Sequence, residues 1–587
     1  MTPSRRGVRR ARSAAGALAA LLALALLISG CSGVPSSSAP AVIRTIDGGV
    51  DDVALPRGPL PGDDQRSIVA GFLRANVSTD SRHASARQYL TAEASATWQD
   101  SPVTIVEDLP STPTLESSTT ATVPIRRIGR VDTAGVYSAT LGDATAPLET
   151  LSFGLVQVDG QWRIDELASG LYVRAEDFRL SYAQYNLYFW DSTETVLVPD
   201  PRYAAIRGQS LATFLLEQLL DSRRPALSQS LISRIPSDQP STVRPAVVVT
   251  PGSPTDIELV GIRQQPADTI PKIAAQLAFT FGPAVSGALR IVENGSPVPV
   301  LGTDGTFRRA DFAVYSPDPV TSPRVVYIRD GAVFQAPGGD PIAGNAGSGA
   351  LGLTSVAATG DEALRLAAVG GPGGRTLYLG DQGGALAPVT LPAGTDGPLT
   401  RPSWAVRAGE VWVSDQRSLI RVASDGSAAV VPVVLQSGET ADGRITALRL
   451  SRDGARVALI YGTGDERGLY IGSIVRSAQD VRVDPLIKIT PASLRLTDVA
   501  WNDSSRLLVA GRVRGASEDG MWAVQIDGSL LSERSTQGLP VAELTSVTVA
   551  SAQFPWVAVD NAVWEQRGES WARAIPDARG SAPAYVE

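Results

Sequence analysis

The stretch TALRLSRDGARVALI, residues 446–460, consists of two apolar runs joined by a polar turn that contains Asp453-Gly454. An Asp-Gly pair between two such runs is a strong signal for a β-hairpin. A threonine opens a similar unit about every 46–51 residues along the C-terminal part of the chain. These units start at Thr354, Thr400, Thr446, Thr497 and Thr545. The spacing lies in the range of four-stranded propeller blades, so the sequence predicts a β-propeller.

The predicted propeller covers residues 304–587. A partial unit beginning at Thr306 brings the number of blades to about six, and five or seven stay open because closure often splits one blade between the two ends of a propeller. The cluster Gly370–Gly374 lacks the lysine and helix that follow a phosphate-binding loop, so we predict a blade loop there. Three tryptophans are expected to pack between blades rather than to form a binding face: Trp404, Trp412 and Trp564.

Residues 176–303 alternate between strand-like and helical patterns. Ser210 is expected to cap one helix, and Pro271 fits the first turn of another. The region resembles the GerMN domain, a small α/β module of envelope and sporulation proteins. The resemblance is carried by the stretches YFWDSTETVLVPDPR, SLATFLLEQLL, SLISRIP and AAQLAFTFG. Because the known role of that module is association, the resemblance implies a partner surface and no catalysis.

Residues 65–175 are predicted to form an α+β domain with helices first and an antiparallel sheet after them. In the second helical segment an apolar residue stands at every fourth position: Ala86, Leu90, Ala94 and Trp98. This spacing predicts one helix through the segment. The strands end in a hairpin turned by Asp159-Gly160. Helices followed by a curved sheet resemble the cone-shaped fold of nuclear transport factor 2 (NTF2) relatives, which sometimes bind ligands, but we interpret this domain as a scaffold.

The first 30 residues have the pattern of a signal peptide. Met1–Arg12 carries five arginines and no acid, and an apolar core of about 14 residues follows. That core is shorter than the roughly 20 residues of a membrane-spanning helix, so cleavage is expected. The residues Ile28, Ser29, Gly30 and Cys31 resemble the bacterial lipobox, in which the cysteine thiol receives diacylglycerol. The resemblance implies cleavage between Gly30 and Cys31.

Cys31 is the only cysteine of the chain. The lipobox implies that it carries a covalent diacylglycerol and an N-acyl chain, and two chains hold a protein stably where one is marginal. We therefore expect a lipid-anchored protein on the extracytoplasmic face of the cell membrane, with residues 31–64 as a flexible tether rich in proline and serine. The general secretory route is favoured, although Ser4–Arg9 partly resembles a twin-arginine export motif.

The composition narrows the possible chemistry. A net charge of −8 makes nucleic acid a poor partner. His83 is the only histidine, and it is expected to be solvated at the start of a helix. One histidine and one lipid-bearing cysteine leave no residues for a His-ligated zinc or copper site or a Cys–His nucleophile pair. We therefore expect no cofactor, no metal site and no catalytic residue, and only a hydrolase that works with carboxylates alone stays open.

The order of these regions resembles the LpqB family of actinobacterial lipoproteins. Two stretches of the first domain add to the resemblance, IVAGFLRAN and ARQYLTAEASATW. It covers essentially the whole chain after the signal peptide. It implies an accessory lipoprotein of the MtrA–MtrB two-component system that acts on the extracytoplasmic domain of the sensor kinase and affects cell-envelope homeostasis and division. No catalytic residue is carried over.

Two other functions remain as alternatives. A solute-binding lipoprotein would need a small-molecule cleft with converging aromatic and polar groups. A propeller hydrolase acting on cell-wall material would need a pair of carboxylates in the central funnel. The single histidine makes the hydrolase the weaker of the two.

Overall fold

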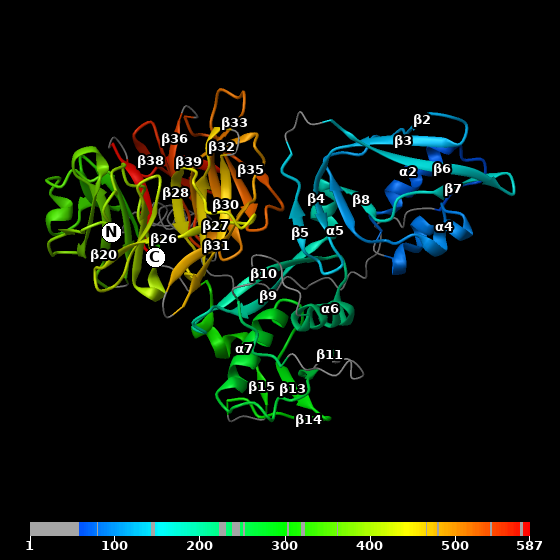
Figure 1. Ribbon diagram of the computed structural model, residues 1–587, viewed down its shortest axis with the longest axis horizontal. Helices are drawn as coiled ribbons and strands as arrows, with labels where there is room; N and C mark the ends of the chain where they lie inside the picture. The colour runs from blue at the N-terminus through cyan, green and yellow to red at the C-terminus, as the bar shows by residue number, and fades with distance from the viewer. Residues whose placement is uncertain are drawn as a thin grey trace, which may run out of the picture. The chain divides into compact units, whose positions relative to one another are not determined.

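The computed structural model (Figure 1) describes residues 58–78, 80–142, 147–221, 231–236, 247–249, 253–301, 305–318, 323–360, 362–464, 467–477, 480–540, 543–575 and 579–587. Pro56–Glu587 forms one compact unit. The predicted signal peptide and the lipobox residues Ile28, Ser29, Gly30 and Cys31 lie outside the described residues. Their predicted roles therefore stay predictions.

The first domain contains short helices and two four-stranded sheets. One sheet has the order β2-β3-β6-β7 and the other the order β5-β4-β1-β8. Its helices are α2 (Gln65–Ala75), η1 (Ser81–His83), α3 (Ala84–Arg87) and α4 (Ala92–Thr97). Its strands are β1 (Val103–Val106), β2 (Thr114–Leu115), β3 (Thr120–Ile125), β4 (Arg127–Val131), β5 (Tyr137–Ala139), β6 (Glu149–Val158), β7 (Gln161–Glu166) and β8 (Leu171–Arg174). The predicted hairpin is confirmed, because β6 pairs with β7 around Asp159 and Gly160, whose φ angles are 51° and 73°.

The continuous helix predicted through residues 86–98 is wrong. The chain leaves the helix after α3, and Leu90 forms a β-bridge with Ile164. The amide of Thr91 donates to the Ile164 oxygen at 2.9 Å, and the Thr91 side chain then caps α4. All four residues of the predicted apolar face are nevertheless buried: Ala86, Leu90, Ala94 and Trp98. The spacing therefore identified the buried face, while hydrogen bonds to a distant strand decided the backbone.

The start of α2 depends on a side-chain cap. Asp64 accepts a hydrogen bond from the amide of Ser67 at 2.9 Å, and hydrogen bonds from Ser67 lower the pKa of the Asp64 carboxyl. A lowered pKa means that the cap stabilises the helix above pH 3.8 and is lost as the pH falls through the folded value. We expect Asp64→Ala to cost about 1 kcal/mol, which is about fivefold faster hydrogen exchange in the first turn at neutral pH. Asp64→Asn keeps the acceptor and should exchange nearly as slowly as the natural chain, so equal losses in both variants would contradict a capping role.

The second domain is built around one apolar core and two buried helices. Strands β9 and β10 form an antiparallel hairpin, and β11, β12, β13, β14 and β15 form a separate mixed sheet. Helix α5 (Ala175–Ser181) still belongs to the first domain, because its Phe178 lies in the core of that domain. The second domain comprises β9 (Ala183–Trp190), β10 (Leu197–Ala204), α6 (Gly208–Leu220), β11 (Val247–Val248), β12 (Thr255–Glu258), α7 (Thr269–Phe281), β13 (Leu289–Glu293), β14 (Ser296–Pro297) and β15 (Thr306–Phe307). Every residue of α7 from Ile273 to Phe281 is buried, so this helix forms the centre of the domain.

Of the two sequence predictions about helix starts in this domain, one is confirmed and one is wrong. Pro271 lies in the first turn of α7, as expected. Ser210 does not cap α6, because that helix already begins at Gly208 and its N-cap position is Arg207. Gly208 has a φ of 60°, which a residue with a side chain rarely adopts, and this glycine lets the chain enter the helix three residues earlier than predicted.

The C-terminal domain is a propeller. Within its described residues, six sheets follow one another, five of four strands and one of five. They are β16 (Val325–Arg329), β17 (Ala332–Ala336) and β18 (Asp340–Pro341) with β40 (Ser581–Tyr585); β19 (Ser355–Thr359) to β22 (Ala387–Pro388); β23 (Ser403–Ala405) to β26 (Ala428–Val431); β27 (Val433–Leu435) to β31 (Val481–Lys488); β32 (Leu494–Asp503) to β35 (Ser532–Arg534); and β36 (Leu544–Thr548) to β39 (Ser570–Arg573). The pairing of β40 with β16 closes the ring between the two ends of the domain.

The unit that the sequence placed at Thr306 belongs elsewhere. Thr306 and Phe307 form β15, which pairs with β13 of the second domain. The first blade begins instead at Val325. Phe307 is 1% exposed and lies in the core of the second domain, so the burial of this aromatic side chain fixes the strand there.

The repeated threonines have a structural role. In four of the five units the hydroxyl donates to a main-chain oxygen of the next strand: Thr354 to Val369, Thr446 to Ile460, Thr497 to Ala510 and Thr545 to Ala558. In the fifth, Thr400 accepts from the amide of Ser414. The repeated threonine therefore links the first strand to the second in five of the six described blades. Trp404 is buried and donates to Ala357 of the preceding blade, and Gly370–Gly374 lies at the connection between β20 (Arg365–Gly370) and β21 (Thr376–Asp381), both as predicted.

Candidate functional site

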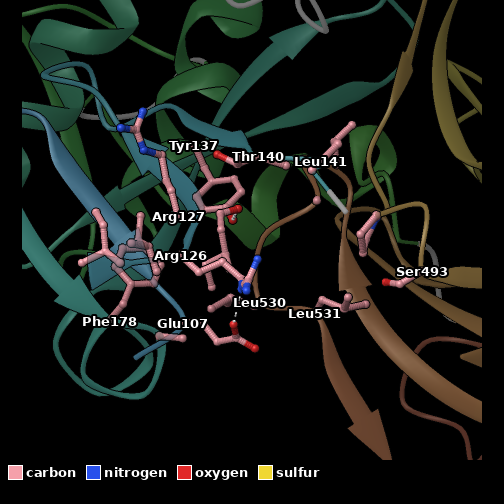
Figure 2. A pocket seen from close by; sticks show the side chains of 18 of the residues that line it. Glu107, Arg126, Arg127, Tyr137, Thr140, Leu141, Phe178, Ser493, Leu530 and Leu531 are labelled. Carbon is pink, nitrogen blue, oxygen red and sulfur yellow. Dashed lines mark hydrogen bonds and ion pairs between the residues drawn. The ribbon is translucent and has the colours of Figure 1, made fainter. Parts of the chain in front are cut away.

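A pocket of about 440 Å³ lies between the first domain and the propeller (Figure 2). The first domain contributes β1, β3, β4, β5 and α5 to the wall, and the propeller contributes the turns around Pro491 and Leu530. The apolar part of the lining includes Ile105, Ile128, Tyr137, Phe178, Ile489 and Leu530. The volume lies within the range of about 300–1,000 Å³ in which proteins bind small molecules.

The turn that carries Leu530 is under local constraint. Leu530 has a φ of 51°, a conformation that costs a non-glycine residue on the order of 1–2 kcal/mol. Gly528 has a φ of 84°, and a Cβ atom there would lie 2.6 Å from the Ile489 oxygen. The Leu530 side chain packs against the core of the first domain. Contact with the first domain therefore holds this strained turn of the propeller in place.

Charged groups stand among the apolar residues of the pocket. The Nε atom of Arg126 lies 3.0 Å from a carboxylate oxygen of Glu107, and Arg127 forms an ion pair with Glu149. Figure 2 shows Arg126 extending from the first domain, with Glu107 at the end of the dashed line and Leu531 and Ser493 on the propeller side. Arg179 donates to the main-chain oxygen of Leu531 at 3.1 Å.

The centre of the propeller is filled by charged side chains. Arg401 and Arg449 face Asp498, whose carboxylate accepts two hydrogen bonds from Arg449 at 3.0 and 3.2 Å. Burial, followed by the charge of Arg449, lowers the pKa of Arg401 to about 9. Glu587 lies close to the same arginines, and burial raises the pKa of its carboxyl. The space left beside them is about 30 Å³, about the share of one water molecule in the liquid.

The two alternative functions make different demands on these sites. Two carboxylates do lie at the centre of the propeller, Asp498 and Glu587, but arginines face both of them. The space measured beside them is small. The pocket beside Leu530 does combine aromatic, apolar and charged groups, as a solute-binding protein would need.

The only histidine is not in either site. His83 ends η1 in a left-handed conformation directly before α3, so its predicted place at a helix start is confirmed. It is less solvated than predicted, because its side chain is 17% exposed and its Nδ1 atom lies 3.1 Å from a carboxylate oxygen of Asp100. Among the described residues no group of histidine, cysteine, aspartate and glutamate is placed to hold a metal ion. In the same part of the chain, no helix has both the length and the apolar content to cross a membrane.

The sequence did not point to the pocket. Its residues come from segments more than 300 positions apart, and only the doublet Arg126-Arg127 is a local sign of a charged surface. The lipobox residues Ile28, Ser29, Gly30 and Cys31 contribute to neither site within the described structure, because they lie outside it.

These domains define a mixed α+β and β-propeller protein. Two parts of the chain match known domain families: residues 58–179 match the lipoprotein LpqB N-terminal domain, and residues 331–586 match the lipoprotein LpqB beta-propeller domain. The chain is 30% identical to lipoprotein LpqB of Nocardia farcinica, with 92% of each protein covered. It is also 30% identical to lipoprotein LpqB of Streptomyces avermitilis, with 96% of each covered. The chain therefore belongs to the LpqB lipoprotein family.

Solved structures similar to this chain were also found. One is a chain of the nidogen/laminin complex, with a TM-score of 0.32, 9% sequence identity, and coverage of 45% of this chain and 98% of that one. Another is a putative TolB from Agrobacterium tumefaciens, with a TM-score of 0.29, 13% identity, and coverage of 44% of this chain and 90% of that one.

Proposed function

We propose that this chain is a lipid-anchored accessory protein without enzymatic activity, which acts on a sensor kinase of the MtrA–MtrB type. It is held by Cys31 at the extracytoplasmic face of the cell membrane and affects cell-envelope homeostasis and division. Membership of a family of named lipoproteins supports the lipid anchor. The kinase partner rests on the family resemblance, and the chain has an acidic net charge that fits a protein partner better than nucleic acid.

One structural observation carries the non-enzymatic part of the proposal. Arg401, Arg449 and Asp498 neutralise one another at the centre of the propeller, where little space remains for a substrate. The outer surfaces of the blades and of the two α+β domains are then the surfaces available to a partner. We interpret the first of these domains as NTF2-like and the second as GerMN-like, and the order of their helices and strands supports this. Both would serve as interaction modules.

The proposed mechanism is a shift of the kinase between conformations. Anchoring through Cys31 confines this protein to the membrane that holds the kinase, which raises its effective concentration to about the millimolar range. At such a concentration, even a weak complex between this protein and the kinase is populated. Binding one conformation of the kinase more tightly than another would shift the balance of its signalling.

The test is a calorimetric titration of the soluble chain, residues 32–587, with the isolated extracytoplasmic domain of the cognate kinase. We expect saturable binding with a Kd of about 100 µM or tighter, because confinement can support affinities of that order. The outer domain of an unrelated sensor kinase serves as the control and should not bind. If solution binding is absent, both proteins are anchored to the same vesicle, and absence of binding there as well would contradict the proposal.

A further inference from the structure

The pocket between the first domain and the propeller is lined mainly by apolar side chains from both domains. Ile105, Ile128 and Phe178 come from the first domain, and Ile489 and Leu530 come from the propeller. A volume of about 440 Å³ with such a lining is suited to the apolar body of a small molecule. The apolar wall therefore predicts that affinity rises with the amount of hydrocarbon that a ligand buries.

The charges around this apolar wall favour an anion. Three arginines and two glutamates line the pocket, which leaves one positive charge in excess. In each ion pair the arginine is the more buried partner: the side chains of Arg126 and Arg127 are 29% and 35% exposed, against 65% and 47% for Glu107 and Glu149. The carboxylates therefore face solvent more than the guanidinium groups do.

Two of these arginines are not fully matched by acceptors or carboxylates among the described residues. The Nε atom of Arg127 is buried and has no hydrogen-bond acceptor among the described residues. A buried donor without an acceptor is costly, and a shift of the guanidinium group toward a ligand oxygen would relieve that cost. Arg179 donates to the neutral main-chain oxygen of Leu531, so its charge is not matched there by a carboxylate. Both observations point to an anionic group in the pocket.

We propose that this pocket binds an amphipathic carboxylate, with its head group at the arginines and its hydrocarbon chain against Phe178, Ile489 and Leu530. Such a ligand touches the first domain and the propeller at once, so its binding would stabilise the contact between them. In Figure 2 the labelled Arg126 and Arg127 lie on the first-domain side of the pocket, and Leu531 and Ser493 lie on the propeller side. The inference goes beyond the proposed function and stands whether or not a kinase is the partner.

The experiment uses the soluble chain, residues 32–587, which contains the whole compact unit Pro56–Glu587. Octanoate, decanoate and dodecanoate are titrated by calorimetry. We expect one molecule bound per chain, with affinity rising about fourfold for each added methylene group until the pocket is full. Decanol has the same chain as decanoate without its charge, and it should bind at least about tenfold more weakly, because hydrogen bonds to charged groups are the stronger ones.

Substitutions locate the site. Ser493→Trp fills the pocket from the propeller side and Thr140→Trp fills it from the first domain, and each should abolish decanoate binding. Val158→Trp adds the same bulk at an exposed position of β6 outside the pocket, and it should bind as the natural chain does. Arg127→Gln should weaken decanoate by about tenfold and leave decanol unchanged. Arg506→Gln, at an exposed ion pair with Asp503, is its control.

Several results would overturn the inference. They are the absence of decanoate and dodecanoate binding up to about 1 mM, equal affinity for decanoate and decanol, and binding that survives both tryptophan substitutions. The two tryptophan substitutions lie on different walls of the pocket. The result of each is used only if the circular dichroism of that variant matches that of the natural chain. If one of them fails to fold, the other decides the location of the site.

Discussion

Replacing Asp498 with alanine is expected to lower the melting temperature of the propeller by roughly 10 °C, the consequence of a loss of about 3–5 kcal/mol. The Asp498 side chain is 7% exposed and holds three groups together. Its carboxylate accepts from Arg449 at 3.0 and 3.2 Å and from the amide of Val547 at 3.0 Å, and it lies 3.8 Å from Arg401. Alanine would leave two buried guanidinium groups with only Glu587 nearby to balance their charge, and one buried amide without an acceptor.

Differential scanning calorimetry of the soluble chain measures this effect, and the control is Asp381→Ala. Asp381 also pairs with an arginine, Arg365, but at 3.9 Å and with its side chain 72% exposed. We expect that control to change stability by no more than about 0.5 kcal/mol. Adding Arg449→Ala to Asp498→Ala should cost less than Arg449→Ala does alone, because the two residues belong to one network. Fully additive losses would contradict an ion-pair origin.

The blades could be predicted because each one is a local structure. The turn at Asp453-Gly454 and the threonine before it lie within one repeat, and a threonine at the same place bonds to the neighbouring strand in four other blades. The closure of the ring could not be predicted in this way. Strand β40 (Ser581–Tyr585) pairs with β16, which is about 250 residues away, and nothing in the composition of either strand encodes that pairing.

In the segment 86–98, the spacing of the apolar residues predicts which side chains are buried but not where the helix is interrupted. The four apolar side chains are buried, as their spacing predicts. The helix is interrupted at Leu90, because the Ile164 amide donates to the Tyr89 oxygen and the Thr91 amide donates to the Ile164 oxygen in place of helix hydrogen bonds. The spacing that predicts burial can be seen within this segment. The hydrogen bonds that interrupt the helix cannot, because Ile164 lies outside the segment.

The candidate pocket is a property of the tertiary structure. Arg127 and Leu530 meet only because the first domain packs on a turn of the propeller. A lone apolar residue on a blade turn is common, so Leu530 does not stand out in the sequence, and the doublet that contains Arg127 does not indicate what lies opposite it. The predicted lipid site at Cys31 is the opposite case, because a lipobox is a contiguous motif and needs no fold to be seen. It remains a prediction from the sequence.

Asp527 is expected to make the contact between the second domain and the propeller sensitive to pH. It follows β34 (Gly520–Gln525), and one carboxylate oxygen accepts from the amide of Ser529 at 2.9 Å while the other is buried with no partner among the described residues. Ser529 in turn bonds to the hydroxyl of Tyr203 in the second domain. Nearby Asp200 is paired with Arg202 at 3.1 Å, so that arginine is already used.

Burial raises the pKa of Asp527 from 3.8 to about 6, and the charge of Asp200 adds to the effect. The folded chain therefore holds this proton more tightly than the unfolded chain does. Its contribution to stability is complete below about pH 4 and is lost as the pH rises through about 6. Two pKa units correspond to nearly 3 kcal/mol, and we expect about 2 kcal/mol because the residue still reaches solvent in part.

Asp527→Asn should therefore be more stable than the natural chain by about 2 kcal/mol at mildly alkaline pH, and the two should converge below about pH 4. Asparagine keeps the oxygen that Ser529 needs but carries no charge to bury. Calorimetric scans over this pH range measure the difference, with the exposed Asp381→Asn as the control for any general effect of removing an acid. A variant that is destabilised at every pH would mean that the ionised carboxylate holds Ser529 and Tyr203 in place, and that its charge is matched by the surrounding structure.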